Sequence, residues 1–245
     1  MAFEEFVAAT PTALLGESGK VFYAGRAAFS APSDIYILGL NPGGDPADPG
    51  ECSVQDNIRF VSTKAPDLWS AYQDEAWKRW APGDAPLQQR LQHLFHDLAD
   101  LRTVPSSNLI FVRSRRETGL GAGAKELEDL CWPFHETVLR RLSTKVIVCL
   151  GDSAGRRVRR RIGAIAEVDR FVEQNERKWT SRTHRSPTGM AVVTLTHPGV
   201  ADWTTSAADP SALLRRGLRG ECGSFRIAAT DLVGPASRQR EQSGR

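Results

Sequence analysis

Four short runs of apolar residues, rich in β-branched side chains, stand out along the chain. They are Asp34–Leu40, Asn108–Val112, Lys145–Leu150 and Ala191–Leu195. Their apolar character is nearly continuous rather than alternating, which is typical of strands that are buried on both faces of a parallel sheet. Helices are therefore expected between them, because parallel strands need crossover connections and a cover on each face of the sheet.

The intervening stretches carry the 3.6-residue periodicity of amphipathic helices. Four helices are predicted, at Pro86–Leu101, at Ala124–Leu142, directly after Gly151 and at Ser211–Leu218. Asp152 or Ser153 is the expected N-cap of the third helix, and Gly220 is the expected stop of the fourth. Residues 43–57 are rich in Gly, Pro and Asp, so they are predicted as a loop.

This alternation of strands and helices predicts an α/β fold. Its expected form is a three-layer α/β/α sandwich with a small, mainly parallel four-stranded central sheet. Residues 1–233 are expected to make a single domain. Residues 234–245 are polar and aperiodic, so we expect them to form a disordered tail.

The composition indicates where in the cell the protein is expected and whether a membrane is among its partners. No run approaches the roughly 20 apolar residues of a membrane helix, and Glu4 and Glu5 stand where a signal peptide needs positive charge. The four cysteines are unpatterned, which fits a reducing cytoplasm better than a disulfide framework. We therefore expect a cytoplasmic monomer without a membrane partner.

Charge is distributed unevenly along the sequence. Residues 1–137 hold 12 Lys and Arg against 19 Asp and Glu, a net charge of −7, whereas residues 138–245 hold 20 against 10, a net charge of +10. Arginine supplies 26 of the 32 basic residues, and its planar fork matches phosphate geometry. The basic half could face DNA or RNA; ordinary solvated faces of an arginine-rich protein would give the same count.

Unusual residues lie at the ends of the predicted strands, where ligands bind in open α/β sheets. The segments are GLNPG at 39–43, SSN at 106–108, LGDSAG at 150–155 and THPG at 196–199. Each alone is ordinary turn or packing chemistry, since Asn, Pro and Gly favour turns for backbone reasons. All four in this order make a far more specific pattern.

This pattern resembles the uracil-DNA glycosylase superfamily over about residues 34–203. Residues 39–43 look like the first family motif in its Asn form, as in the mismatch-specific and single-strand-selective branches. Residues 107–113 (SNLIFVR) resemble the strand that carries the base-reading asparagine. Residues 131–151 resemble the helix and strand that precede the second motif in the thermophilic-type branch, and residues 196–199 stand in place of its His-Pro-Ser loop.

The resemblance implies roles for residues around a flipped base. Asn41 would position the attacking water and His197 would stabilise the departing base anion, and these two are the candidate catalytic residues. Asn108 would read the edge of the base with its amide. The candidate substrate-binding residues are Gly39, Leu40, Pro42, Gly43, Phe60 and Asn108. Phe60 stands near the place of the base-stacking aromatic; the plain alternative is a core phenylalanine.

The resemblance also indicates DNA contacts outside the base pocket. The candidate residues are Ser153, Arg156, Pro198, Gly199, Val200 and Trp203. Val200 or Trp203 would wedge into the gap left by the base, with Trp203 preferred by size and ordinary packing as its alternative. The segment GRRVRRR at 155–161 is expected to leave five arginines largely solvated, where some touch phosphates or all line a solvated face.

Several departures from the family pattern limit what the resemblance implies. The cysteines of the thermophilic-type iron–sulfur cluster are missing except for Cys131, so we expect no metal and no cofactor. Gly199 replaces a serine, which weakens the phosphate grip of that loop. Gly43 stands where the uracil-strict branch has a blocking tyrosine, which leaves room for C5 substituents. Position 41 holds Asn rather than an acid; Asp45 is an alternative base for activating water, or a turn residue.

The resulting hypothesis is a monofunctional DNA glycosylase that acts on uracil or a C5-modified pyrimidine, with DNA as its partner. No lysine occupies the motifs, which argues against a Schiff-base lyase step. One alternative is a catalytically silent protein of the same fold that binds DNA or modified bases, for example in phage defence. Another is a nucleotide- or phosphate-binding α/β enzyme, which the absence of G-x-x-x-x-G-K-[ST] and G-x-G-x-x-G disfavours.

Overall fold

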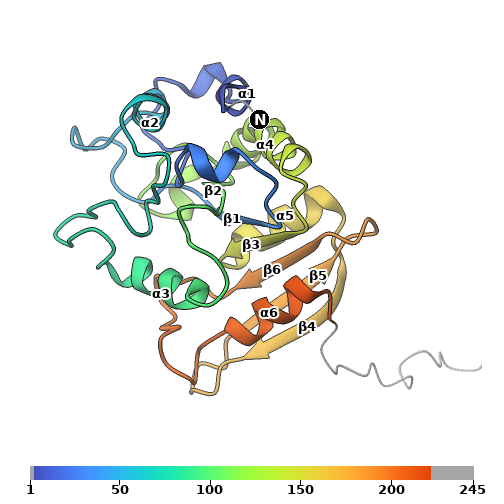
Figure 1. The fold of residues 1–245 in the computed structure, drawn as a ribbon. Helices are drawn as coiled ribbons and strands as arrows, with labels where there is room; N and C mark the ends of the chain where they lie inside the picture. Colours follow the sequence, from blue (N-terminus) through green and yellow to red (C-terminus); the bar gives the residue numbers. More distant parts are fainter. Residues whose placement is uncertain (1–2, 222–245) are drawn as a thin grey trace, which may run out of the picture.

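One six-stranded sheet runs through the centre of the structure, a computed structural model that describes residues 3–221 (Figure 1). The strands are β1 (Ile35–Gly39), β2 (Ser106–Asn108), β3 (Val146–Leu150), β4 (Ala166–Val172), β5 (Thr180–Arg185) and β6 (Ala191–Leu195). Their order is β2-β1-β3-β6-β5-β4. The pairs β1–β2, β1–β3 and β3–β6 are parallel, whereas β5–β6 and β4–β5 are antiparallel.

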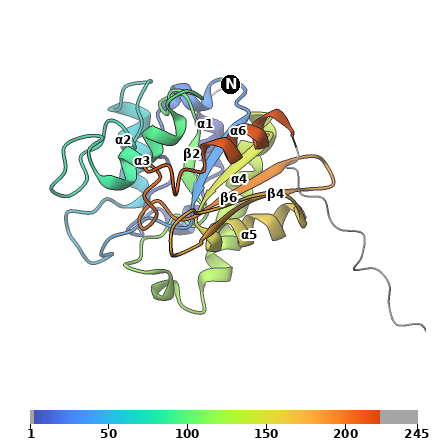
Figure 2. The ribbon, with the colours of Figure 1, turned by 90° about the horizontal axis from the view of Figure 1, so that it is seen from below.

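Helices pack on the sheet from both sides (Figure 2). The described α-helices are α1 (Glu4–Ala8), α2 (Val54–Thr63), α3 (Pro86–Phe95), α4 (Ala124–Arg141), α5 (Asp152–Ile162) and α6 (Ser211–Arg219). A Cβ atom added to Gly155 of α5 would lie 2.1 Å from Thr194 Oγ1, and one added to Gly217 of α6 would lie 3.0 Å from Val193 Cγ2. Because neighbouring residues of a strand point to opposite faces, α5 and α6 cover opposite faces of β6.

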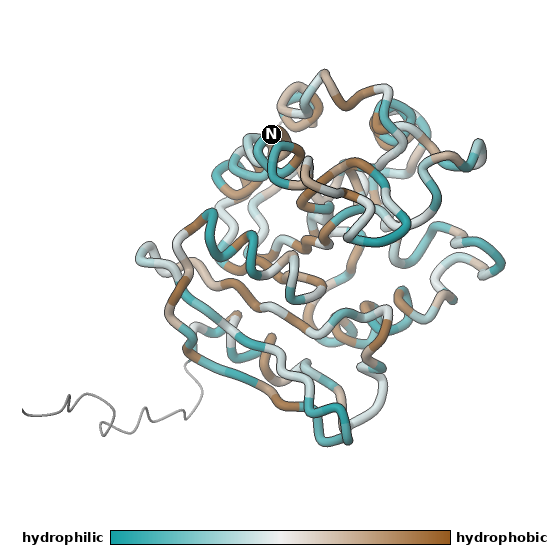
Figure 3. The backbone as a smooth tube through the Cα atoms, turned by 180° about the vertical axis from the view of Figure 1, so that it is seen from behind, coloured by the Kyte–Doolittle hydropathy of each residue, from teal (hydrophilic) through white to brown (hydrophobic). Residues whose placement is uncertain are grey.

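The core lies along the parallel strands. Every residue of β1, β3 and β6 is buried, and Figure 3 shows hydrophobic residues following these central strands. Edge-to-face aromatic contacts among Phe22, Phe29, Phe111 and Phe134 extend the core toward the N-terminal segment. No described helix is both long enough and apolar enough to span a bilayer.

The parallel half of the sheet confirms the predicted strand pattern, with one correction. The second strand is β2 at Ser106–Asn108, not Asn108–Val112. Residues 109 and 110 still donate backbone hydrogen bonds to Gly39 and Leu40, at 2.9 Å each. Residues 109–111 are apolar because they are buried near β1, although the regular pairing of β2 with β1 ends at Asn108. Asn108 is therefore the last residue of the strand rather than its first.

The prediction of a four-stranded sheet is wrong because β4 and β5 were missed. Their sequences, AEVDRFV and TSRTHR, are mostly polar, and residues of β4 alternate between partial exposure and exposure around one buried position. An antiparallel hairpin at a sheet edge can face water, so it does not need the apolar run that identifies a buried parallel strand. The sheet is thus larger and less uniformly parallel than expected.

The predicted helices are all present, with local corrections. Residues 43–57 are not wholly a loop, because α2 begins at Val54. Ser53 Oγ accepts from the Asp56 N–H at 3.1 Å, and the Asp56 carboxylate accepts from the Ser53 N–H at 3.3 Å, which makes a capping box. The N-cap of α5 is Gly151 rather than Asp152 or Ser153, and α3 ends at Phe95. The predicted tail at 234–245 lies outside the described residues.

Candidate functional site

The chemistry-bearing residues lie along one edge of the sheet. Parallel strands in the order β2-β1-β3-β6 bring Asn108, Asn41, Gly151 and His197 to the same carboxyl edge. Adjacent strands are about 4.8 Å apart, so the ends of β1 and β6 are separated by roughly 10 Å. That span is suited to a single nucleobase and its sugar.

Asn41 is held with a defined orientation. Its Nδ2 donates to Ser114 Oγ at 2.8 Å and to the Pro42 carbonyl at 3.0 Å. The loop is fixed in turn, since the Ser114 N–H donates to the Pro42 carbonyl at 3.1 Å. With the NH₂ group engaged, the Asn41 Oδ1 atom, which has no protein partner among residues 3–221, can accept a hydrogen bond from water. An amide can orient a water molecule in this way, but it cannot take the proton.

Asn108 sits in a tight position against β1. Its side chain is 5% exposed, and a Cβ atom added to Gly39 would lie 2.1 Å from the Asn108 Oδ1 atom. The two residues are paired in the β1–β2 register. The Asn108 amide can approach this closely only because residue 39 has no side chain. This explains on steric grounds why the motif has a glycine at this position.

Gly39→Ala is expected to displace the Asn108 amide. Overpacking of this kind costs about 1 to 3 kcal/mol, and it should lower the activity that depends on Asn108. Urea unfolding measures the first effect. Gly16→Ala is the control, because a Cβ atom added there has no heavy atom within 4 Å. If Gly39→Ala and Gly16→Ala have the same free energy of unfolding and the same activity, the close contact between Gly39 and the Asn108 amide is contradicted.

A buried histidine supports the segment that follows Asn108. His135 Nε2 donates to the Leu109 carbonyl at 3.1 Å, and Nδ1 faces the Tyr36 hydroxyl at 2.8 Å. Burial lowers the pKa of His135 to about 4. The imidazole is therefore neutral at neutral pH, with its proton on Nε2.

The protein is expected to lose stability as the pH falls from 6.5 to 4. In this window the unfolded chain binds a proton at His135, whose ordinary pKa is about 6.5, and the folded protein does not. Protonation of His135 in the unfolded chain alone lowers the free energy of unfolding by about 3 kcal/mol over this pH range. Urea unfolding at pH 7 and pH 4 should show that much less loss in His135→Gln than in the natural protein. Parallel losses in the two proteins would contradict the neutral assignment.

His197 is oriented by two glycines. The Gly199 N–H donates to His197 Nδ1 at 2.9 Å, so the neutral imidazole carries its proton on Nε2. Gly151 has a φ of 107°, and a Cβ atom there would lie 3.2 Å from His197 Cδ2. The surrounding protein partly desolvates the imidazole and lowers its pKa. His197 thus offers a neutral N–H donor at the carboxyl edge.

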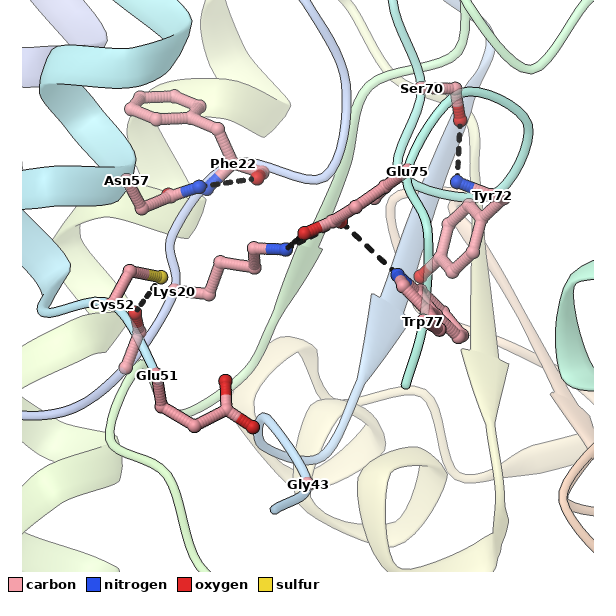
Figure 4. A network of polar contacts seen from close by, with 12 residues as sticks. Lys20, Phe22, Gly43, Glu51, Cys52, Asn57, Ser70, Tyr72, Glu75 and Trp77 are labelled. Carbon is pink, nitrogen blue, oxygen red and sulfur yellow. Dashed lines mark hydrogen bonds and ion pairs between the residues drawn. The ribbon is translucent and has the colours of Figure 1, made fainter. Parts of the chain in front are cut away.

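A polar cluster around Lys20 and Glu75 was not predicted from the sequence (Figure 4). Lys20 Nζ donates to both Glu75 carboxylate oxygens, at 2.5 and 2.6 Å, and Trp77 Nε1 donates to the same carboxylate at 3.2 Å. The ammonium also lies 5.1 Å from the centroid of the Tyr23 ring. Burial raises the pKa of Tyr23, and the adjacent Asn108 amide opposes the shift. Tyr23 therefore stays protonated beside Asn108.

Arg113 links this region to the first motif. It is buried, donates to the Gly43 carbonyl and pairs with Glu51 at 2.9 Å. A Cβ atom added to Gly43 would have no heavy atom within 4 Å. The backbone at position 43 is thus fixed by a buried guanidinium, while the space next to its Cα is open.

Sequence reasoning had little chance of finding these residues. Lys20 and Glu75 are 55 positions apart and belong to no motif. Tyr23 reaches Asn108 because the segment 19–23 runs beside β2, with the Tyr23 N–H bonded to the Ser106 carbonyl at 3.0 Å. Only the short apolar run at 21–24 hinted at such a strand-like segment.

Phe60 lies on α2 and is 38% exposed. Its ring meets Trp69 edge-on, with centroids 5.3 Å apart. The aromatic ring beside Asn108 is instead Tyr23, which stacks on Tyr72 with centroids 5.8 Å apart. Tyr23 thus becomes a candidate for lining the site next to Asn108.

The expectation that Trp203 inserts into DNA is wrong. Its side chain is fully buried, and Nε1 donates to Thr196 Oγ1 at 3.3 Å. Its size suits the core rather than a wedge. Val200 is 54% exposed and remains a candidate. Pro198 is buried and its carbonyl accepts from Arg90, so it shapes the loop from within.

The arginines of α5 are less free than expected. Arg157 and Arg161 pair with the buried Glu128 of α4 at 2.8 and 2.6 Å. Arg159 Nη1 lies 2.6 Å from His184 Nε2. All three are only partly exposed, because they join α5 to α4 and to β5. The prediction of a largely solvated arginine face is wrong for them.

The first turn of α5 keeps its candidate DNA contacts. Arg156 is exposed and pairs with Asp152 at 2.9 Å, an exposed pair that contributes little to stability. Ser153 Oγ donates to Glu117 at 2.6 Å. Both side chains lie at the N-terminal end of α5, directly after the carboxyl end of β3.

Asp45 is poorly suited to activating water. Its carboxylate accepts from Arg115 and, at 3.1 Å, from the Ala47 N–H. The hydrogen bond from Arg115 is the main cause that lowers the pKa of Asp45 below its usual value. A weaker base fixed in a turn favours Asn41 as the group that orients water.

The described residues show no cluster of three or more His, Cys, Asp or Glu side chains that could hold a metal ion. Cys131 is buried, and burial raises the pKa of its thiol to about 12. The thiol is therefore protonated at neutral pH and packs as a small apolar group.

Comparison with known proteins assigns no family to this chain. No family model matches the sequence, and no curated protein is significantly similar to it. Function is therefore inferred from the residues and geometry of the carboxyl edge.

Proposed function

We propose that this protein is a monofunctional DNA glycosylase. It hydrolyses the N-glycosidic bond of uracil or of a C5-modified pyrimidine in DNA and leaves an abasic site. The supporting observation is that two oriented amides, Asn41 and Asn108, share one sheet edge with a neutral His197 whose N–H points away from the loop that holds it. This set of groups suits a base that has been flipped out of the stack.

The chemistry assigns each group one task. As the bond between C1′ and the base breaks, its electron pair leaves with the base, and positive charge develops on the sugar. His197 Nε2–H donates to O2 of the departing base anion and stabilises it. A water molecule that donates to Asn41 Oδ1 adds to C1′ and loses its proton to solvent, because the amide cannot accept it. This predicts modest turnover.

The pocket chemistry favours a pyrimidine. The Asn108 amide has a donor and an acceptor to pair with the N3 and O4 positions of a uracil-like ring. The open space at Gly43 leaves room for a C5 substituent. A lyase step is not expected, because Lys20, the lysine near this pocket, has its ammonium bound by the Glu75 carboxylate.

A strand-nicking assay tests the proposal and identifies the base. Labelled oligonucleotides would carry uracil, 5-hydroxymethyluracil, hypoxanthine, thymine opposite guanine, or a modified cytosine. Cleavage should require hot alkali and should proceed at similar rates on uracil and 5-hydroxymethyluracil. It should be absent in Asn41→Ala and His197→Ala within the time that the natural protein needs for complete cleavage. Cleavage without alkali, or a borohydride-trapped adduct, would overturn the monofunctional assignment. DNA binding without cleavage would favour the silent binder.

A further inference from the structure

The hairpin formed by β4 and β5 places its tip beside the His197 loop. β5 is antiparallel to β6, with Arg182 opposite Thr194, so β5 begins at the edge where β6 ends (Figure 1). The tip, residues 173–179, therefore reaches the carboxyl edge that carries the candidate site. Its sequence, EQNERKW, combines basic and aromatic residues.

The tip is anchored to the loop that follows β6. Arg177 Nη1 donates to the Val200 carbonyl at 2.8 Å, and the Gln174 N–H donates to the Ala207 carbonyl at 2.7 Å. Arg177 also lies 3.7 Å from the fully buried Glu173. The hairpin and the His197 loop are thus joined, and a group on the tip has a fixed position relative to His197.

Trp179 and His197 line the same depression. The depression has a volume of about 250 Å³, and its other lining residues include Asp152, Arg182, Thr194 and Thr196. The Trp179 side chain is 38% exposed, and the Arg177 guanidinium lies 4.5 Å from its ring centroid. The aromatic ring of Trp179, the Arg182 side chain and the imidazole of His197 therefore line one concave surface.

We infer that this depression binds the unpaired nucleobase next to the flipped nucleotide, with Trp179 as its stacking platform. Aromatic rings stack on any nucleobase, and neighbouring cations hold the backbone. Arg177 orients the ring by a cation–π contact, and Lys178 stands next to it at the tip with a φ of 51°. The inference rests on the proposed function in taking DNA as the partner and a flipped nucleotide as its neighbour.

Fluorescence anisotropy with a labelled single-stranded oligonucleotide tests the inference. Trp179→Ala is expected to weaken binding about 5- to 100-fold, whereas Trp179→Phe should retain most of the affinity. Trp80→Ala is the matched control, because Trp80 is also 38% exposed and lies under an arginine, Arg79, at 5.1 Å. Urea unfolding of each variant confirms that the fold is intact.

The outcomes separate this inference from the proposed glycosylase activity. Equal affinities of Trp179→Ala and Trp80→Ala would overturn the stacking role, whatever the result for base release. Selective loss in Trp179→Ala supports it, even if no base is released and the protein is a silent binder. If the natural protein does not bind the single-stranded oligonucleotide at low salt, the stacking inference is wrong, and the strand-nicking panel alone decides the proposed glycosylase activity.

Discussion

Replacing His197 by alanine is expected to slow base release by about 100- to 1,000-fold, the usual cost of removing one donor that stabilises a developing anion. The donor is preorganised, because the Gly199 N–H occupies Nδ1 and leaves the proton on Nε2. Single-turnover kinetics on the preferred oligonucleotide measure the effect. The change should appear in the rate of the chemical step rather than in DNA affinity.

The control for this variant is His96→Ala. His96 is largely exposed and pairs with Asp97 on its own segment at 2.7 Å, so its removal should leave base release unchanged. A His197→Ala rate within a few-fold of the natural protein would contradict the role of the imidazole. A loss of rate that follows from lost DNA binding would instead assign His197 to positioning of the loop.

Trp203→Ala is expected to lower the free energy of unfolding by about 3 to 5 kcal/mol, as for other large aromatic side chains removed from a core. The ring is fully buried, and its Nε1 hydrogen bond to Thr196 would be lost as well. Urea unfolding measures the change. The substitution should also destabilise the loop that carries His197, because Thr196, which bonds to Trp203, directly precedes His197.

Val200→Ala is compared with Trp203→Ala to decide which of the two residues acts as the wedge. Val200 is exposed, so truncating it should change stability by no more than about 0.5 kcal/mol. A role in filling the gap left by the base would appear as slower base release at unchanged stability. Unaltered stability of Trp203→Ala together with weaker DNA binding would contradict the burial of Trp203 and restore it as the wedge.

The parallel strands could be predicted because their burial leaves a direct trace in the sequence. β1, β3 and β6 are covered on both faces, so nearly every position is apolar. The β4–β5 hairpin leaves no such trace, since water covers part of it. The same hairpin carries Trp179, so the proposed stacking role of Trp179 could not be inferred before the antiparallel pairing placed the hairpin next to β6.

The candidate site was predictable where its residues follow the strands in sequence motifs. Asn41, Asn108 and His197 belong to this group, because parallel strand order alone brings their positions to one edge. Tyr23, Lys20 and Glu75 come together through long-range packing that no local pattern encodes. Trp203 was wrongly predicted as the wedge because it was chosen by size. The size of a side chain near a motif does not show whether that side chain is buried.

Mass spectrometric detection of a free base tests the proposed glycosylase activity most directly. The natural protein, incubated with an oligonucleotide that carries uracil or 5-hydroxymethyluracil, should yield the free base and an abasic strand in equal amounts. The Asn41→Ala/His197→Ala double variant should yield neither within the same time. Failure of the natural protein to release a base from any oligonucleotide of the panel, under conditions where it binds the DNA, would contradict the proposed activity.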